Sequence, residues 1–526
     1  MSDHPPGRSP VYGAEAMAAT GHPTATAAAI EILADGGNAV DASLAASAVL
    51  CVVLPHMTGI GGDGFVQVVE PDGQVVAYNS GGTAGCGALP ERYGEGVPRD
   101  GLASACVPGL PDAWEAVHAA HGSLPVDRLF ERAIDLATDG FPISGGVAAA
   151  LDEYQSRLAK SDAAAAIFLP NDGRPPQPSQ LLRQPQLAQT LEAFAIGGRA
   201  AFYDGAVGEQ LARAFQQEAD GLISAADLLA HECVIGEPLR AGYRDVVVTE
   251  QPPISQGHVL LQELLLLEPF DLSAMGHLSP DSIHTMVEAK KLAFADRSAA
   301  AGDPRFHDVD WDALLSPQRA AERAGEIDSA HAGIQPSGDS KPTDTTQFAI
   351  GDREGRAVSF IQSIFHPFGC AAVAGETGIL MNNRMFGFSL AAGHPNVMAP
   401  GKRTVHTLNT FTVFIDDEFW LAGGTPGADF QVQTNLQVIT GLVDYGLGIQ
   451  EAVDAARWGH TTARDVVVEK RIPAATLAEL ERRGHVLQRG GDWVEGLGSV
   501  QIVAKLPGGG WEGVCDPRRE GAAIGF

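Results

Sequence analysis

Two adjacent threonines, Thr345 and Thr346, stand where the character of the chain changes abruptly. The preceding stretch, 328–341, is polar, rich in Gly, Ser and Pro, and poor in hydrophobic residues. It cannot bury enough apolar surface to offset its ordering entropy, so we expect a loose loop. After the pair, 348–350 and 357–361 have strand composition on either side of a turn. A nucleophile at the junction of a loop and a buried strand is what a self-cleaving enzyme requires.

The chemistry that this junction offers depends on the bond between Asp344 and Thr345. Cutting that bond would give Thr345 a free α-amine next to its own hydroxyl. An α-amine has a pKa of about 7.7–8.0, so near neutral pH it can act as the general base for the hydroxyl. No distant His or Asp is then needed. The alternative is an ordinary Thr-Thr pair at the start of a strand, which β-branching favours.

Motifs spread over the C-terminal third favour the catalytic interpretation. They are Thr345-Thr346, 355–358, Gln362-Ser363-Ile364, Phe368-Gly369, 378–383, Phe388-Ser389, Pro395-Asn396, Lys402-Arg403, 424–427 and 516–518. In order and spacing this set resembles the gamma-glutamyltransferase family of Ntn hydrolases. His22-Pro23, the segment 36–41 and the glycine loop 59–64 are similar to the N-terminal signature of the same family, so the likeness runs almost end to end.

The resemblance implies a fold and a subunit organisation. The fold would be of the α+β class, a four-layer αββα Ntn-hydrolase sandwich. Self-cleavage would give a large subunit, 1–344, ending in the linker 328–344, and a small subunit, 345–526. We expect strands from both subunits to share one core, which makes the two an obligate heterodimer. Further dimerisation is left open.

The resemblance also implies catalytic roles. Thr345 would be the nucleophile, released by cleavage after Asp344. Ser363 occupies the place of a hydroxyl that hydrogen-bonds the amine of the nucleophile. Gly427 and Ala428 match a Gly-Gly pair whose backbone amides form the oxyanion hole, and such donors contribute several kcal/mol to acyl transfer. Alanine in place of the second glycine need not move the amide.

The substrate-binding positions depart from the family pattern. Phe365 replaces an Asn, Arg384 and Gly387 follow Asn383 where the family has Gln and Asp, and His406-Thr407 replaces Ser-Ser. The expected carboxylate-binding Arg of the large subunit has no clear counterpart. A γ-glutamyl ammonium group would therefore lack its anionic partner, at a cost of about 1–3 kcal/mol.

Arg384 suggests a different substrate, a compact acid whose carboxylate lies close to the scissile carbonyl, because Arg pairs with carboxylates in a bidentate manner. The alternative for Arg384 is an internal salt bridge, and for His406 a packed core histidine. Phe365 is expected to be a pocket wall. The motifs 360–365, Asn383-Arg384, 394–396 and 406–409 together resemble the oxamate-amidohydrolase-like branch of the family. A related branch, in alkylproline pathways, is thought to cleave a C–C bond beside an oxo-acid.

Three functional hypotheses follow. The first is a self-processing hydrolase that cleaves an amide, or a C–C bond next to an oxo-acid, in a small carboxylated molecule. The second is a gamma-glutamyl transferase or hydrolase with an altered pocket. The third is an unprocessed pseudoenzyme with a binding role. A denaturing gel distinguishes the third from the others, and a chromogenic γ-glutamyl anilide distinguishes the first two.

Net charge, cysteine spacing and the distribution of apolar residues argue against nucleic-acid-binding, metal-binding and membrane proteins. The net charge of −30 over 526 residues argues against nucleic acid as a partner, because binding phosphates requires clustered Lys and Arg. The six cysteines are scattered without a C-x-x-C pair, so we expect buried reduced thiols, no metal site and no cofactor. The first residues show no basic region followed by an apolar run, and no segment reaches membrane-spanning length, so a cytoplasmic protein without membrane contact is expected.

The sequence also predicts individual helices and strands. Asn38 should cap a helix over 39–53 that is apolar nearly all round and therefore buried. The glycine loop 59–64 is expected to be a tight turn into a strand. The stretch 243–249 is expected to be one strand. A helix over 284–297 carries several charges, which we expect to form a solvated face or structural ion pairs.

Overall fold

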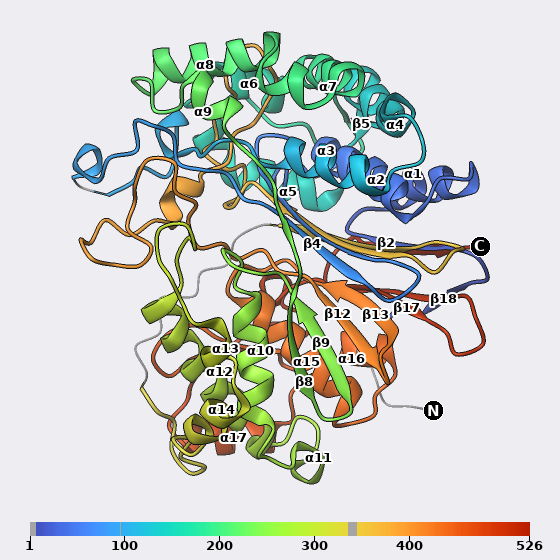
Figure 1. Ribbon diagram of the computed structural model, residues 1–526, viewed down its shortest axis with the longest axis vertical. Helices are drawn as coiled ribbons and strands as arrows, with labels where there is room; N and C mark the ends of the chain where they lie inside the picture. The colour runs from blue at the N-terminus through green and yellow to red at the C-terminus, as the bar shows by residue number, and fades with distance from the viewer. Residues whose placement is uncertain (1–6, 95, 335–344) are drawn as a thin grey trace.

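The computed structural model describes residues 7–94, 96–334 and 345–526. Two seven-stranded sheets lie face to face, and a layer of helices covers the outer face of each sheet (Figure 1). This is the αββα sandwich that the sequence predicted. In Figure 1 the helices of the first half of the chain lie above the sheets, and α10–α17 lie below them.

The first sheet has the order β1-β18-β17-β13-β12-β9-β8. Its strands are Val11–Gly13 (β1), Leu239–Tyr243 (β8), Val246–Glu250 (β9), Phe411–Ile415 (β12), Glu418–Gly424 (β13), Gln501–Lys505 (β17) and Trp511–Cys515 (β18). The second sheet has the order β19-β2-β10-β11-β3-β4-β7. Its strands are Met17–Thr20 (β2), Asp63–Val69 (β3), Val75–Ser80 (β4), Val234–Gly236 (β7), Thr346–Gly351 (β10), Ala357–Ser363 (β11) and Ala522–Gly525 (β19).

Each sheet combines strands from both sides of position 344. In the second sheet β10 lies between β2 and β11, and β11 in turn pairs with β3, all antiparallel. Neither side of the chain could therefore pair its backbone groups without the other, since an exposed sheet edge leaves unpaired N–H and C=O groups. The expectation that both segments share one core is confirmed.

Two helix layers enclose the sheets. The layer on the second sheet contains Pro23–Ala34 (α1), Ala39–Val53 (α2), Leu110–His121 (α3), Val126–Asp139 (α4), Gly145–Leu158 (α5), Asp162–Phe168 (α6), Pro185–Tyr203 (α7), Ala206–Glu218 (α8) and Ala225–Leu229 (α9). The layer on the first sheet contains Gly257–Leu267 (α10), Leu272–Met275 (α11), Pro280–Ala300 (α12), Trp311–Leu314 (α13), Pro317–Ala324 (α14), Phe430–Val443 (α15), Ile449–Asp454 (α16) and Ala474–Arg482 (α17).

Smaller elements complete the fold. They are the ribbon Phe141–Pro142 (β5) and Leu181–Leu182 (β6), the three-stranded sheet of Trp458–His460 (β14), Asp465–Val468 (β15) and Val486–Arg489 (β16), and short 3-10 turns, of which Arg384–Gly387 belongs to the site described below.

The helix after Asn38 forms as predicted. The Asn38 side-chain oxygen accepts hydrogen bonds from the N–H of Val40 and of Asp41, at 2.9 and 3.0 Å. The Asp41 carboxylate in turn accepts from the Asn38 N–H, which completes a capping box. Every residue of α2 is buried, because the helix runs between the second sheet and the outer helices.

The two sheets pack through small side chains and a few large ones. Ala349 from the second sheet and Ala422 and Trp511 from the first belong to one buried cluster. A Cβ at Gly351 would come within 2.7 Å of the Trp511 ring, so glycine is required for this close approach. The tight contact fixes the end of β10 against the first sheet.

One local prediction was wrong, and a second was confirmed in one of its two alternatives. The stretch 243–249 forms parts of two strands, β8 and β9, joined at Arg244, whose φ of 52° makes a tight turn. On α12 the side chains of Glu288, Lys290 and Lys291 are buried rather than solvated. Lys291 pairs with Glu288 at 2.7 Å, so the alternative of structural ion pairs is the correct one for these two.

The cysteines follow the expectation in part. All six are free thiols; four are buried, Cys233 is half-buried and Cys86 is exposed. Among the described helices, none combines the length and the apolar character needed to cross a bilayer.

Candidate active site

Thr345 lies immediately before β10 and is buried, with 1% of its surface exposed. It lines a cavity of about 320 Å³ together with Thr346, the helix-layer residues Leu54 and His56, and Pro426 from the loop after β13. A hydroxyl at this place has room for a reacting group beside it. Asp344, the other residue of the predicted cleavage site, lies outside the described residues.

Ser363 ends the neighbouring strand β11. Because Thr346 pairs with Gln362 in the antiparallel ladder, Ser363 lies beside Thr345. The Ser363 hydroxyl accepts a hydrogen bond from the Phe365 N–H at 2.8 Å. On its other side β11 pairs with β3, where Asp63 stands opposite Ser363.

Asp63 holds two of the predicted substrate-binding residues. Its Oδ2 lies 2.9 Å from Nε of Arg384 and 2.9 Å from Nε2 of His406. Its Oδ1 accepts the Gly82 N–H at 2.7 Å. The side chains of Asp63, Arg384 and His406 are all at most 1% exposed, so these three groups form a closed charged cluster beside Ser363.

Burial and mutual contact set the protonation of this cluster. Burial alone would raise the pKa of Asp63, but Arg384 and His406 outweigh it and hold the pKa below its ordinary value. Burial, together with the positive charge of Arg384, lowers the pKa of His406 to about 4. At neutral pH His406 is therefore neutral, and the carboxylate of Asp63 balances the guanidinium of Arg384.

Only one edge of the Arg384 guanidinium is used in this ion pair. Its Nη1 and Nη2 atoms are buried and have no hydrogen-bond partner among the described residues. The group stacks on the Phe365 ring at 4.4 Å. The internal salt bridge considered for Arg384 thus exists. It leaves the two terminal nitrogens, which can bind a carboxylate in a bidentate manner, without a hydrogen-bond partner in the described part of the chain.

Asn383 and Thr407 are engaged within the protein. Asn383 donates to His366 Nδ1 at 2.8 Å and accepts from the His366 N–H at 3.1 Å, so its side chain braces the segment 365–366. The Thr407 carbonyl accepts hydrogen bonds from Gln256 at 2.9 Å and from Asn409 at 3.0 Å, while its side chain is half-buried.

The turn 427–428 follows β13 and leads into α15. Gly427 has φ of 125° and Ala428 has φ of 52°, a region that L-residues rarely adopt. No described residue accepts a hydrogen bond from the N–H of either one. Since Pro426 lines the cavity at Thr345, the turn lies next to the predicted nucleophile.

Comparison with known proteins agrees with this geometry. Residues 25–526 match the family described as Gamma-glutamyltranspeptidase. The chain belongs to the gamma-glutamyltranspeptidase family. It is 36% identical over 525 residues to the Glutathione hydrolase-like YwrD proenzyme of Bacillus subtilis, covering 98% of this chain and 99% of that protein.

Two further relatives cover the same extent. The Oxamate amidohydrolase proenzyme of Klebsiella pneumoniae is 36% identical over 525 residues, covering 97% of this chain and 98% of that protein. The crystal structure of cephalosporin acylase from Bacillus halodurans superposes with a TM-score of 0.94 at 32% identity, covering 100% of this chain and 98% of that one. The chain is therefore an enzyme of the Ntn-hydrolase superfamily, and the family includes self-processed proenzymes.

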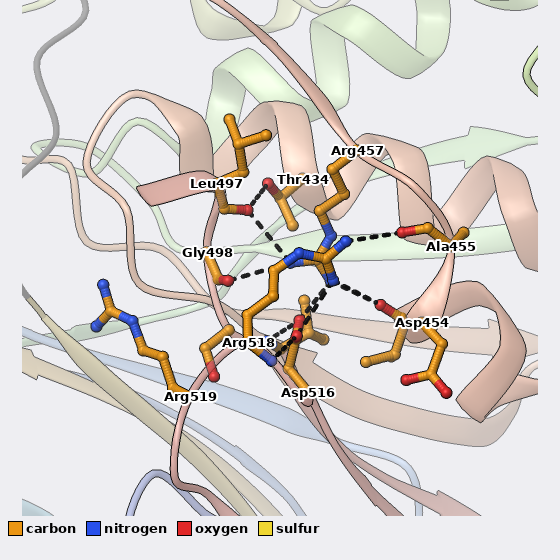
Figure 2. A network of polar contacts seen from close by, with 12 residues as sticks. Thr434, Asp454, Ala455, Arg457, Leu497, Gly498, Asp516, Arg518 and Arg519 are labelled. Carbon is orange, nitrogen blue, oxygen red and sulfur yellow. Dashed lines mark hydrogen bonds and ion pairs between the residues drawn. The ribbon is translucent and has the colours of Figure 1, made fainter. Parts of the chain in front are cut away.

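In this family member a buried charge network adjoins the cavity through Arg518, and Figure 2 shows its residues Arg457, Arg518 and Asp516. Arg457 donates to the carbonyls of Leu497 and Gly498, both at 3.2 Å, and pairs with Asp516 at 2.5 Å. Arg518, which lines the cavity, pairs with Asp516 at 3.2 Å. Burial would raise the pKa of Asp516, but these two arginines keep it below its ordinary value. The network fixes the loop after residue 494 and the C-terminal tail against the cavity.

Asp63 was not predicted as a site residue, because the glycine loop 59–64 was expected to be only a turn. A Cβ at Gly62 would come within 2.3 Å of the Ser363 carbonyl oxygen, so the loop packs directly on the end of β11. A lone carboxylate in an apolar, glycine-rich loop that enters a buried strand was the available signal, since such a charge requires a partner.

One group of potential metal ligands occurs in the described residues, formed by His284, Glu288 and His485. His284 Nδ1 lies 2.8 Å from His485 Nε2, and Glu288 is paired with the ammonium group of Lys291 at 2.7 Å. His284 and Glu288 lie on α12 and His485 lies just before β16 (Val486–Arg489), and none of the three lines the Thr345 cavity.

Proposed function

We propose that the chain cuts itself between Asp344 and Thr345 and that Thr345 then hydrolyses an amide of a small carboxylated molecule. The proposal rests on the place of Thr345, at the start of a central strand and open to a cavity. Large and small subunits, 1–344 and 345–526, would stay together because each sheet takes strands from both.

The proposed reaction has two stages. In maturation the Thr345 hydroxyl attacks the Asp344 carbonyl carbon, and the peptide C–N bond breaks to free the α-amine, which takes up the hydroxyl proton. Water then hydrolyses the resulting ester, which regenerates the Thr345 hydroxyl and leaves Asp344 with a free carboxylate. In turnover the hydroxyl attacks the substrate carbonyl while its proton passes to the α-amine. The amine leaving group takes that proton, and water then cleaves the acyl ester.

Two further roles follow from the contacts. Ser363 would orient the α-amine, since it lies beside Thr345 at the end of β11. The N–H groups of Gly427 and Ala428 would bind the tetrahedral oxygen, which small side chains allow to approach closely.

The substrate class is carried by a single observation, the two buried Arg384 nitrogens without a described partner. A carboxylate bound there would receive two parallel hydrogen bonds with Phe365 behind the guanidinium. The ammonium group of a γ-glutamyl substrate fits less well, because the Asp63 carboxylate is already shared by Arg384 and His406. Oxamate and other short amido-acids fit the proposal best.

The test has two parts. Mass spectrometry of the purified protein should find a fragment that begins at Thr345. A panel containing oxamate, longer amido-acids, acyl oxo-acids and γ-glutamyl anilide should then show turnover of the short acids at least tenfold above that of the anilide. A single full-length chain without activity would support the pseudoenzyme, and brisk turnover of the anilide would support a gamma-glutamyl hydrolase.

A further inference from the structure

Gln256 connects the two halves of the candidate site. Its Nε2 donates to the carbonyl oxygens of Thr407 and Ala428, both at 2.9 Å. Its backbone N–H donates to the His406 carbonyl at 2.9 Å. One fully buried side chain therefore joins the segment 406–407, which carries the partner of Asp63, to the turn 427–428.

A charged pair fixes the orientation of this amide. Nη1 of Arg297, on α12, donates to Oε1 of Gln256 at 2.5 Å and to Asp429 at 2.6 Å. Because a guanidinium can only donate, it holds the Gln256 oxygen toward itself and the NH₂ group toward the two carbonyls. The Arg297 guanidinium is itself stacked on Phe294, at 4.2 Å.

The ion pair of Arg297 and Asp429 also holds the C-terminal end of the turn 427–428. Asp429 directly follows Ala428, so Arg297 reaches the turn once through Gln256 and once through the Asp429 carboxylate. Ala428 needs this support, because its φ of 52° is a left-handed conformation that is unfavourable for a non-glycine residue.

We propose that Gln256, locked by Arg297 and Asp429, is a positioning residue that sets the 427–428 amides relative to the substrate-binding segment 406–407. The inference rests on the proposed function, in which those amides bind the tetrahedral oxygen. Removing one such donor lowers the rate about 10²–10³-fold, and misplacement by 1 Å can lower it about 10²-fold. We therefore expect an effect on the chemical step rather than on binding.

The test variant is Gln256→Glu, which keeps the shape and replaces the NH₂ donor by an oxygen facing two carbonyls. Gln437→Glu is the matched control. Gln437 Nε2 also donates to two backbone carbonyls, those of Gln433 at 2.9 Å and Trp458 at 3.0 Å, but on α15 and away from the cavity. Arg297→Lys is the second test variant, which keeps the positive charge and loses the fork.

The readout is acylation of the mature protein by a β-lactone. The Thr345 hydroxyl attacks the lactone carbonyl carbon, the ring C–O bond breaks, and the ring oxygen takes up the proton. Rates at several lactone concentrations give the limiting rate, kinact, and the half-saturating concentration, KI. This separates the chemical step from binding without requiring the natural substrate.

We expect Gln256→Glu to lower kinact about 10–100-fold with KI within threefold of wild type, and Arg297→Lys to lower it about tenfold. Gln437→Glu should leave kinact and KI unchanged, even if it lowers the Tm as much as Gln256→Glu does. A folded Gln256→Glu chain that remains uncut would also support the inference, because self-cleavage passes through a tetrahedral oxygen of the same kind.

If Gln256→Glu and Arg297→Lys both keep kinact within threefold of wild type, the inference is wrong. If Gln256→Glu does not fold, Arg297→Lys alone decides the outcome. Labelling of Thr345→Ala as fast as of wild type would instead refute the proposed function, and with it the role of the turn.

Discussion

The buried pair of Asp63 and Arg384 allows the two possible roles of Arg384 to be separated. Both side chains are at most 1% exposed. Arg384→Gln leaves the Asp63 carboxylate with His406 as its remaining side-chain partner, and breaking a buried pair in this way costs about 3–5 kcal/mol. Asp63→Asn together with Arg384→Gln removes both charges, so we expect the double variant to recover at least about 2 kcal/mol of that loss.

Catalysis should not follow the same pattern. If the terminal nitrogens of Arg384 bind the substrate carboxylate, both variants lose a charge-assisted bidentate contact of about 1.5–3 kcal/mol. kcat/KM should then fall about 10–150-fold in both, including the double variant with its recovered stability. Maturation should survive in both, because it involves no external carboxylate.

Stability is measured by urea unfolding in a Thr345→Ala background, where the chain is expected to stay uncut. Kinetics are measured on the mature enzyme with the best substrate of the panel. Arg244→Gln is the matched control. It breaks an ion pair with Asp444 at the β8 edge of the first sheet, and it should lower stability without changing kcat/KM. Wild-type kcat/KM in the stable double variant would refute the ligand role and leave Arg384 as a structural charge.

Thr345→Ala should give one uncut chain without turnover, and a 182-residue fragment on a gel or in a mass spectrum (526 − 344) would contradict the assignment of the nucleophile. Ser363→Ala should slow maturation and kcat about tenfold or more while leaving Tm near that of wild type, because a hydroxyl that orients the amine contributes little to stability; unchanged rates would disprove its role. The contribution of His406 to stability should be complete above pH 6.5 and be lost as the pH drops toward 4, because burial lowers the folded-state pKa of His406 to about 4 and the unfolded chain then binds more protons. His406→Asn should flatten this dependence by up to about 1.4 kcal/mol per pH unit, measured by urea midpoints at pH 7, 6 and 5, and an unchanged slope would mean that His406 titrates normally.

Local features were predictable from the sequence because neighbouring residues determine them. Asn38 caps α2 through its own side chain, and the strand after Thr345 begins where composition changes from polar to β-branched and aromatic. The turn at Arg244 between β8 and β9 was not predicted, because the sequence gives no strong local indication that a non-glycine residue adopts a positive φ.

The candidate site was predictable only in part. Thr345, Ser363 and the turn 427–428 were identified by motif, and the structure places the first two on adjacent strands. The ion pair of Arg384 could not be predicted from the sequence, because its partner Asp63 lies 321 positions away in the chain. The two residues meet only when β3 pairs with β11.

By itself, the sequence determined the family, the buried helix after Asn38 and the place of the threonine at the start of a buried strand. These follow from periodicity, capping and motif spacing, which act over a few residues. Only the tertiary structure decided which charges neutralise one another. It placed one carboxylate between Arg384 and His406 and left the far edge of the guanidinium without a described partner. The physical reason is that the free energy of a buried charge depends on every group within a few ångströms, and antiparallel pairing of distant strands chooses those groups.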